Sequence, residues 1–497
     1  MPIRDARRVV PASLANFGGI FQHSATSLPP ARAERVLGAA PRFEAGGLTA
    51  TPAAGVTADG AWVAVLGQVE RRPDIDQRLG TQGASDGQLF WAALQHYGDG
   101  AWLRIPGEWV VALYDPVEEA LHLARSPGAG SPLVYLVRQG ERTLFGTELE
   151  ALRGEAGALD EGRLTDWVEV GLWSDAERTA YTELETVPPG TAFVVQKKGR
   201  NRRHRFWTFA PLTIPRRLSL EQARTELQAT LQTVCQGRRP PQRCSMFASG
   251  ASARSLAALY GQAPSVCNTP VGEPRLRSLA LALPGPLPRS RLEIWAGLPP
   301  GALLVELGAP ALMGTSRPAL AAFLTTLAHA FESTPKPGLL RGIIKLGRPI
   351  AEVLGEPFGP ELWATGQRVL ERWRGHLPPE LATRLPGHSS PAPSPRTHGP
   401  VLTGEAFLDR RFLESQDRGL ELELLAARQG REWLAAPFAD VRVVELIFQL
   451  PPELFIAEGK VALLLGGQAL SPLPKAADER ADREAGLALY RASAKAS

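Results

Sequence analysis

The stretch that decides the fold runs Cys244-Ser-Met-Phe-Ala-Ser-Gly-Ala-Ser-Ala-Arg-Ser-Leu-Ala-Ala-Leu259. Its apolar run, Met246 to Ala248, stops at Ser249-Gly250, and a helix-forming run begins at Ser255. This order predicts a strand, a tight turn and a helix. Such a turn directs free backbone N–H groups and the positive end of a helix dipole at one place, which favours an anion. We therefore predict an anion-binding loop over residues 249–255.

Three further stretches surround this loop in the second half of the chain. Upstream, Ser219 and Gln222 have the spacing of a capping box in front of an amphipathic helix. Downstream, the apolar run Leu303-Leu304-Val305 predicts a strand that leads to Gly308. Later still, Ala436-Pro437-Phe438-Ala439-Asp440 precedes apolar residues that continue to Leu450. The second half therefore combines helices with short buried strands.

The first half of the chain is richer in strands. Apolar or alternating runs predict strands over residues 16–21, 61–67, 109–115, 120–125, 133–136 and 143–147. Ser85-Asp86 is an N-cap in front of a helix over residues 88–97, and another helix begins at Glu148. Many strands with few helices predict a layered α+β domain.

Composition narrows the class of protein. A length of 497 residues predicts two domains, with three as an alternative, and 44% hydrophobic and 21% charged residues are typical of globular domains. A net charge of +4 is small for this length and does not indicate a nucleic-acid or membrane surface. The three cysteines have no CxxC spacing, so we expect neither a disulfide framework nor a zinc site. No apolar run approaches the roughly 18–20 residues of a membrane span. We expect a soluble, cytoplasmic protein.

In chain order, these segments resemble the asparagine synthetase family, which includes β-lactam synthetases and lasso-peptide cyclases. The matching segments of the first half are Leu66-Gly67-Gln68, Gly107–Asp115, Leu121–Ser126, Pro132–Tyr135 and Val187–Gly190. The resemblance implies a glutaminase-like sandwich over residues 1–210, of the Ntn hydrolase (class II amidotransferase) type. It also implies a parallel α/β synthetase domain over residues 211–497, of the adenine nucleotide alpha-hydrolase-like type.

The chemistry of the glutaminase is missing from the first half. The family needs a cysteine as its first residue, because the free α-amine acts as the base for the thiol. Phe17 stands at that position, and sixteen residues precede it. The chain also has no Arg-Gly-Pro-Asp segment, which grips the glutamine carboxylate in the family. We therefore expect no glutaminase activity.

The resemblance implies a nucleotide site that has also lost much of its chemistry. Where the family's phosphate loop reads Ser-Gly-Gly-x-Asp-Ser-Ser, this chain has Ala251 and Ala253 in place of the second glycine and the metal-side aspartate. Pro310-Ala311 stands where the family's acidic pair belongs, so a second metal-side carboxylate is missing, and Ala462 replaces the family's lysine. Lys460 lies two residues early, and on a helix it would face about 200° away. We assign no catalytic and no metal-binding residue. The degenerate nucleotide-binding set is Ser249, Gly250, Ser252, Arg254, Ser255, Gly308 and Asp440.

Arg254 has two interpretations. A guanidinium can pair with phosphate through two hydrogen bonds, so affinity for a polyanion could persist. Alternatively, the Arg254 side chain fills the space that the nucleotide has vacated.

Three functions fit this pattern. The first is a non-catalytic family member that binds a partner protein, a peptide or a metabolite and needs no cofactor. The second is an AMP-forming amide ligase that uses ATP and magnesium through an acyl-adenylate. The third is a binding module that uses the first domain alone. Whether the chain is an enzyme stays open at this stage, as does a homodimer.

Three local expectations complete the sequence analysis. Lys197 to Arg205 is a basic patch that we expect to be a solvated loop between strands. Residues 376–401 are rich in Pro, Ser, Thr and Gly, and predict either a mobile connector or the remnant of a lid. The tail from Lys475 predicts a solvated helix or a frayed end.

Overall fold

The structure is a computed structural model of the chain. It describes residues 16–22, 43–45, 47–51, 59–128, 130–171, 173, 177–197, 201–208, 218–237, 245–247, 271–298, 303–305, 418–429, 434–450, 454, 456–457, 460–461, 468–469 and 476–496. The segment 376–401 and the loop 249–255 lie outside these residues.

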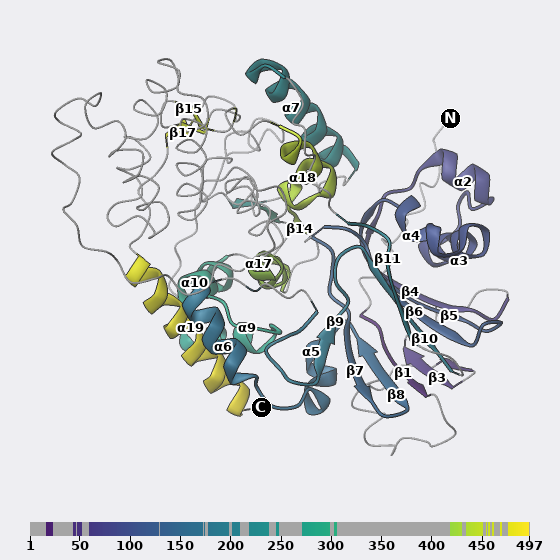
Figure 1. The fold of residues 1–497 in the computed structure, drawn as a ribbon, viewed down its shortest axis with the longest axis horizontal. Helices are drawn as coiled ribbons and strands as arrows, with labels where there is room; N and C mark the ends of the chain where they lie inside the picture. The colour runs from purple at the N-terminus through teal and green to yellow at the C-terminus, as the bar shows by residue number, and fades with distance from the viewer. Residues whose placement is uncertain are drawn as a thin grey trace, which may run out of the picture.

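The first half forms two antiparallel sheets that pack face to face (Figure 1). The first sheet has the order β2-β3-β1-β8-β7-β9 and the second the order β11-β10-β6-β5-β4. Trp62 and Phe145 meet edge to face between the sheets, with ring centroids 6.3 Å apart. The strands are β1 (Gly18–Gln22), β2 (Phe43–Ala45), β3 (Leu48–Thr51), β4 (Trp62–Val69), β5 (Gly107–Asp115), β6 (Ala120–Arg125), β7 (Tyr135–Gln139), β8 (Arg142–Gly146), β9 (Leu184–Thr186), β10 (Thr191–Gln196) and β11 (Arg202–Arg205).

Helices cover the outer face of the second sheet. They are α2 (Pro73–Leu79), α3 (Asp86–Tyr97), η2 (Gly98–Gly100) and α4 (Ala101–Arg104). Phe90 of α3 packs against Trp109 of β5 with ring centroids 4.7 Å apart. Ser85 and Gln88 cap α3 reciprocally, as the sequence predicts. The layered α+β domain is thus confirmed.

The second half contains a parallel sheet of three short strands, β12 (Ser245–Phe247), β13 (Leu303–Val305) and β14 (Leu434–Ala435). A small antiparallel sheet follows: β15 (Ile456–Ala457), β16 (Lys460–Val461) and β17 (Gln468–Ala469). The helices are α7 (Leu220–Gly237), α9 (Glu273–Leu281), α10 (Arg289–Gly297), α17 (Arg418–Arg428), η5 (Pro437–Ala439), α18 (Val441–Phe448) and α19 (Ala476–Ala496).

The outer face of the first sheet is covered by helices from both halves of the chain. The helices α5 (Leu149–Leu152) and α6 (Glu161–Val170), with the turn η3 (Arg153–Glu155), come from the first half. They share one hydrophobic core with α9, α10, α17 and α19. Figure 1 shows the yellow α19 running beside α6 and α10. Residues on both sides of the predicted boundary near residue 210 therefore contribute to one hydrophobic core.

Three local predictions are corrected. The basic patch forms β11 and not a loop, because residues 202–205 pair with β10 and their arginines reach Asp99 and Glu177. The tail is not solvated on all sides, because Leu487, Leu489 and Tyr490 are buried. Lys460 lies in β16, so the helical geometry assumed for it is wrong.

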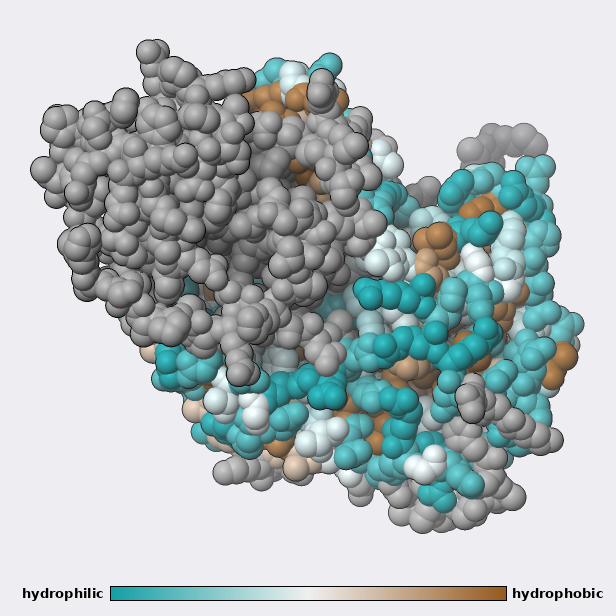
Figure 2. All heavy atoms as spheres, viewed as in Figure 1, coloured by the Kyte–Doolittle hydropathy of each residue, from teal (hydrophilic) through white to brown (hydrophobic). Residues whose placement is uncertain are grey.

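Most of the described surface of the sandwich is polar. Figure 2 shows one face of the molecule, on which hydrophilic residues predominate around small hydrophobic patches. The large hydrophobic side chains exposed in the described part are Leu103 on α4 and Val117 after β5. Within the same part of the chain, each helix is too short or too polar to span a lipid bilayer.

Candidate functional site

Phe17, which the resemblance places at the position of the nucleophile, lies directly before β1. Phe17 is 3% exposed and packs in the core between the two sheets. Its backbone N–H donates to Thr147 Oγ1 (3.1 Å), and the Thr147 N–H donates to the Phe17 carbonyl oxygen (2.9 Å). The Phe17 nitrogen is thus a peptide nitrogen held against β8, and its side chain is a core hydrocarbon. Neither can act as base or nucleophile.

The close packing of β4 against β5 requires a glycine at position 67. Gly67 belongs to Leu66-Gly67-Gln68, the segment that resembles the Asn-Gly-Glu strand end of the family. Its φ is +116°, and a Cβ there would lie 2.1 Å from the Glu108 carbonyl oxygen of β5. Only glycine allows this close approach of the two strands. Packing of β4 against β5 alone therefore accounts for a glycine at this position.

Three stretches of the second half, residues 245–247, 303–305 and 434–435, form one parallel sheet. β12 pairs in parallel with β13, and β13 with β14, so that Ser245, Leu303 and Leu434 lie in register. Because parallel strands end at the same edge of a sheet, the residues that follow these strands start from one edge. The predicted nucleotide residues Ser249, Gly250, Ser252, Arg254, Ser255 and Gly308 lie outside the described residues. They stay a prediction.

Asp440 is the predicted site residue that the structure describes. It is buried, and it caps the N-terminus of α18 by accepting the Arg442 N–H at Oδ1 (2.9 Å). The Arg442 guanidinium also donates to both oxygens of Asp440, at 2.9 Å each. Asp440 thus organises α18 through a cap and a bidentate ion pair.

Arg442 links Asp440 to the sandwich. Its two terminal nitrogens donate to Glu70, just after β4, at 2.7 and 3.0 Å. Hydrogen bonds to Asp440, and further bonds to Glu70, raise the pKa of the Arg442 guanidinium, although partial burial acts against them. The guanidinium therefore stays charged between two carboxylates.

A second ion pair joins the two halves and is more deeply buried than the first. Arg125, at the end of β6, is 0% exposed and lies 3.1 Å from Glu421 of α17, which is 6% exposed. Its guanidinium also donates to the carbonyl oxygens of Ser131 (3.2 Å) and Val187 (3.4 Å). This is a buried ion pair in which the guanidinium also has backbone acceptors, but Arg125 Nε and Glu421 Oε2 are buried without a hydrogen-bond partner among the described residues. Its attraction therefore does not fully offset its loss of solvation.

Other contacts surround these two ion pairs. Arg428 donates to the Gly130 carbonyl oxygen at 2.8 Å, and Trp207 Nε1 donates to Glu445 at 3.0 Å. We refer to this region as the junction. It comprises Glu70, Arg125, Gly128, Gly130 and Trp207 of the first half, and Glu421, Arg428, Asp440, Arg442 and Glu445 of the second.

The sequence points to Asp440 but not to its partners Glu70 and Arg442, nor to the pairing of Arg125 with Glu421. Arg125 is visible in the Leu121–Ser126 segment, yet nothing local to the sequence connects it with α17. The described residues also contain no cluster of His, Cys, Asp and Glu that could hold a metal ion.

Comparison with known proteins agrees with the architecture of the first half. Residues 68–207 match a family model described as a glutamine amidotransferase domain. The matched range starts after Phe17, so it does not include the nucleophile position. These residues are therefore similar to the amidotransferase class of domain.

Parts of the chain align with solved structures. One is glutamine phosphoribosylpyrophosphate amidotransferase from B. subtilis, complexed with ADP and GMP. Its alignment has 12% identity and a TM-score of 0.27, and covers 59% of this chain and 81% of that one. Another, described as the allosteric regulatory enzyme of purine biosynthesis, aligns at 12% identity and a TM-score of 0.24, covering 60% and 70%. No curated protein matches the sequence.

Proposed function

We propose that this protein is an asparagine synthetase-like member of the glutamine amidotransferases that does not hydrolyse glutamine and acts by binding. The observation that carries the proposal is Phe17. A buried phenylalanine, with its nitrogen in a peptide bond, occupies the start of β1. The thiol and the α-amine that the reaction needs both have no counterpart there.

The second half supports the same proposal. Ala253, Pro310-Ala311 and Ala462 replace acidic and basic groups on which adenylation in the family depends. Asp440, which the resemblance assigns to the nucleotide site, is engaged by Arg442 and by the backbone of α18. On this proposal the protein needs neither ATP nor magnesium, and its ligand is a protein or peptide partner or a small metabolite.

The test is ammonia release from glutamine by the full chain. We expect no release above a protein-free blank, and no covalent labelling by a glutamine-like affinity reagent. The matched variant is Thr147→Val, which removes the hydroxyl bonded to the Phe17 nitrogen. Glutamine-dependent release that this substitution abolishes would contradict the proposal.

The second candidate is an ATP-dependent amide-bond former of the β-lactam synthetase or lasso-cyclase kind. One observation favours it: β12, β13 and β14 lie side by side in parallel, so the stretches that follow them start from one sheet edge. Ser249, Gly250 and Ser255 are also retained. Exchange of labelled pyrophosphate into ATP, with candidate amino acids or peptides present, distinguishes this candidate from the first.

A further inference from the structure

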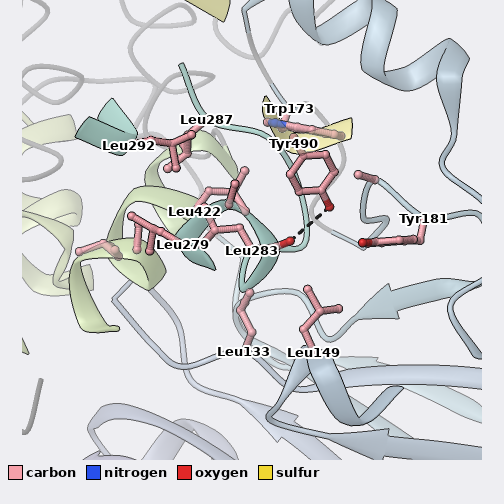
Figure 3. Close-up of a cluster of buried hydrophobic side chains, with 14 of the residues drawn as sticks. Leu133, Leu149, Trp173, Tyr181, Leu279, Leu283, Leu287, Leu292, Leu422 and Tyr490 are labelled. Carbon is pink, nitrogen blue, oxygen red and sulfur yellow. Dashed lines mark hydrogen bonds between the residues drawn. The ribbon is translucent and has the colours of Figure 1, made fainter. Parts of the chain in front are cut away.

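The two halves of the chain share a hydrophobic core. Figure 3 shows Leu133 and Leu149 of the sandwich beside Leu279 and Leu283 from the α9 region. The Tyr490 hydroxyl of α19 donates to the Leu283 carbonyl oxygen at 3.2 Å in the same cluster. Separating the halves would expose this apolar surface to water, which opposes separation.

Backbone hydrogen bonds and charges cross the same boundary. The Ala180 N–H donates to the Pro284 carbonyl oxygen at 2.8 Å. Arg483 of α19 donates to the Val168 carbonyl oxygen of α6 at 2.8 Å. Such contacts fix a register as well as adding attraction, because each donor has its acceptor in only one docked arrangement.

The buried ion pair makes that arrangement specific. The Arg125 guanidinium is fully buried, and Glu421, its acidic partner in the described structure, belongs to the other half. A buried pair contributes little net stability, but loss of one partner leaves an uncompensated charge. The position of α17 against the sandwich therefore depends on the ion pair between Glu421 and Arg125.

Gly128 brings the sandwich against the start of α18. This residue has φ +104°, and a Cβ there would lie 3.1 Å from the Ala439 carbonyl oxygen. The next residue, Asp440, caps α18 and reaches Glu70 through Arg442. The backbone that follows β14 is therefore held by the sandwich through both close packing and charge.

We propose that the glutaminase-like sandwich serves as a permanent internal scaffold for the second half, in which the junction positions α17, α18 and the backbone between β14 and α18. The interaction surface is the junction together with the outer face of the first sheet, and its partner is the second half of the same chain. This inference does not depend on whether ATP is bound.

The first experiment cuts the chain without removing either part. A recognition site for a specific protease is inserted between Leu212 and Thr213, and the purified full chain is cleaved. We expect the two fragments to co-elute in size-exclusion chromatography, even at nanomolar concentration. Fragments that separate at that concentration would overturn the inference.

The second experiment tests positioning in the uncut chain by hydrogen exchange. Gly128→Ala places a methyl group against the Ala439 carbonyl oxygen and should accelerate amide exchange in α18, with α3 unchanged. The matched control is Gly140→Ala, at another positive φ (+56°), where nothing lies within 4 Å. We expect this control to leave both helices unchanged. An α18 exchange rate that Gly128→Ala does not alter would contradict the positioning role.

Discussion

The packing of the C-terminal helix predicts an unusual result for a glycine in a helix. Gly486 lies in α19, where an alanine would normally stabilise the protein by about 0.8–1.0 kcal/mol through helix propensity. A Cβ at this position, however, would lie 2.0 Å from the Leu287 carbonyl oxygen and 3.0 Å from the Arg289 nitrogen. Both atoms belong to the backbone. We therefore expect Gly486→Ala to destabilise the protein.

The magnitude follows from the size of the overlap. Carbon–oxygen contacts of the closest kind lie at about 3.3–3.6 Å, so α19 or its neighbour must move by more than about 1 Å. Overpacking of this kind costs about 1–3 kcal/mol. The shift also weakens the hydrogen bond from Tyr490 to Leu283, a further ~1 kcal/mol. With the propensity gain subtracted, the free energy of unfolding should fall by about 1–3 kcal/mol.

The assay is equilibrium urea unfolding followed by tryptophan fluorescence. The control is Gly162→Ala in α6, where the nearest atom to a Cβ is Asp160 Oδ1 at 3.6 Å, an ordinary contact. That variant should be as stable as the wild type or slightly more stable, because the propensity gain meets no clash. The packing described for α19 is refuted if Gly486→Ala stabilises the protein to the same degree as Gly162→Ala.

Three further predictions test the core, the junction and the pH response. Phe17→Ala should cost about 3–5 kcal/mol in urea unfolding and Phe17→Leu less than about 1.5 kcal/mol, because the side chain fills the sandwich core; equal, small effects would place Phe17 in an open pocket instead. Glu421→Ala should cost about 3–5 kcal/mol, because it leaves the buried Arg125 without its countercharge. The control Glu185→Ala, from an exposed pair with Arg138, should cost less than about 1 kcal/mol, and similar costs for both would argue against a buried junction. Burial lowers the pKa of His122 to about 4 from its ordinary 6.5. Between these two pH values the unfolded chain binds a proton at His122 and the folded chain does not. The free energy of unfolding should therefore be unaffected by this group above pH ~6.5 and fall by up to about 3 kcal/mol as the pH falls to about 4. In His122→Gln, the free energy of unfolding should depend less steeply on pH over this range. A pH dependence equal to that of the wild type would contradict burial of this imidazole.

Features that depend on neighbouring residues could be predicted from the sequence. Ser85 with Gln88 and Ser219 with Gln222 form the expected caps, since a capping box needs only residues three positions apart. The apolar run from Trp109 to Asp115 is a buried strand, as expected. Local spacing was sufficient in each case.

Features that depend on residues far apart in the sequence could not be predicted from the sequence. The run of arginines in β11 predicts a solvated loop, because their acidic partners, Asp99 and Glu177, lie far away in the sequence. The polar sequence of α19 hides a buried face, because the surface it covers comes from residues more than a hundred positions earlier. The junction pairs Glu70 with Arg442 and Arg125 with Glu421, separations at which no periodicity or motif operates. Only the fold brings these charges together.

We propose that this chain keeps the framework of an amide-forming amidotransferase without its chemistry. Calorimetric titration of the full chain with ATP, with and without magnesium, tests it most directly. We expect no heat of binding at millimolar ATP in either condition, because Ala253 and Pro310-Ala311 stand where the resemblance to asparagine synthetases implies metal-side carboxylates. Binding that appears only when magnesium is present would contradict it, since such binding requires acidic ligands that these positions do not supply.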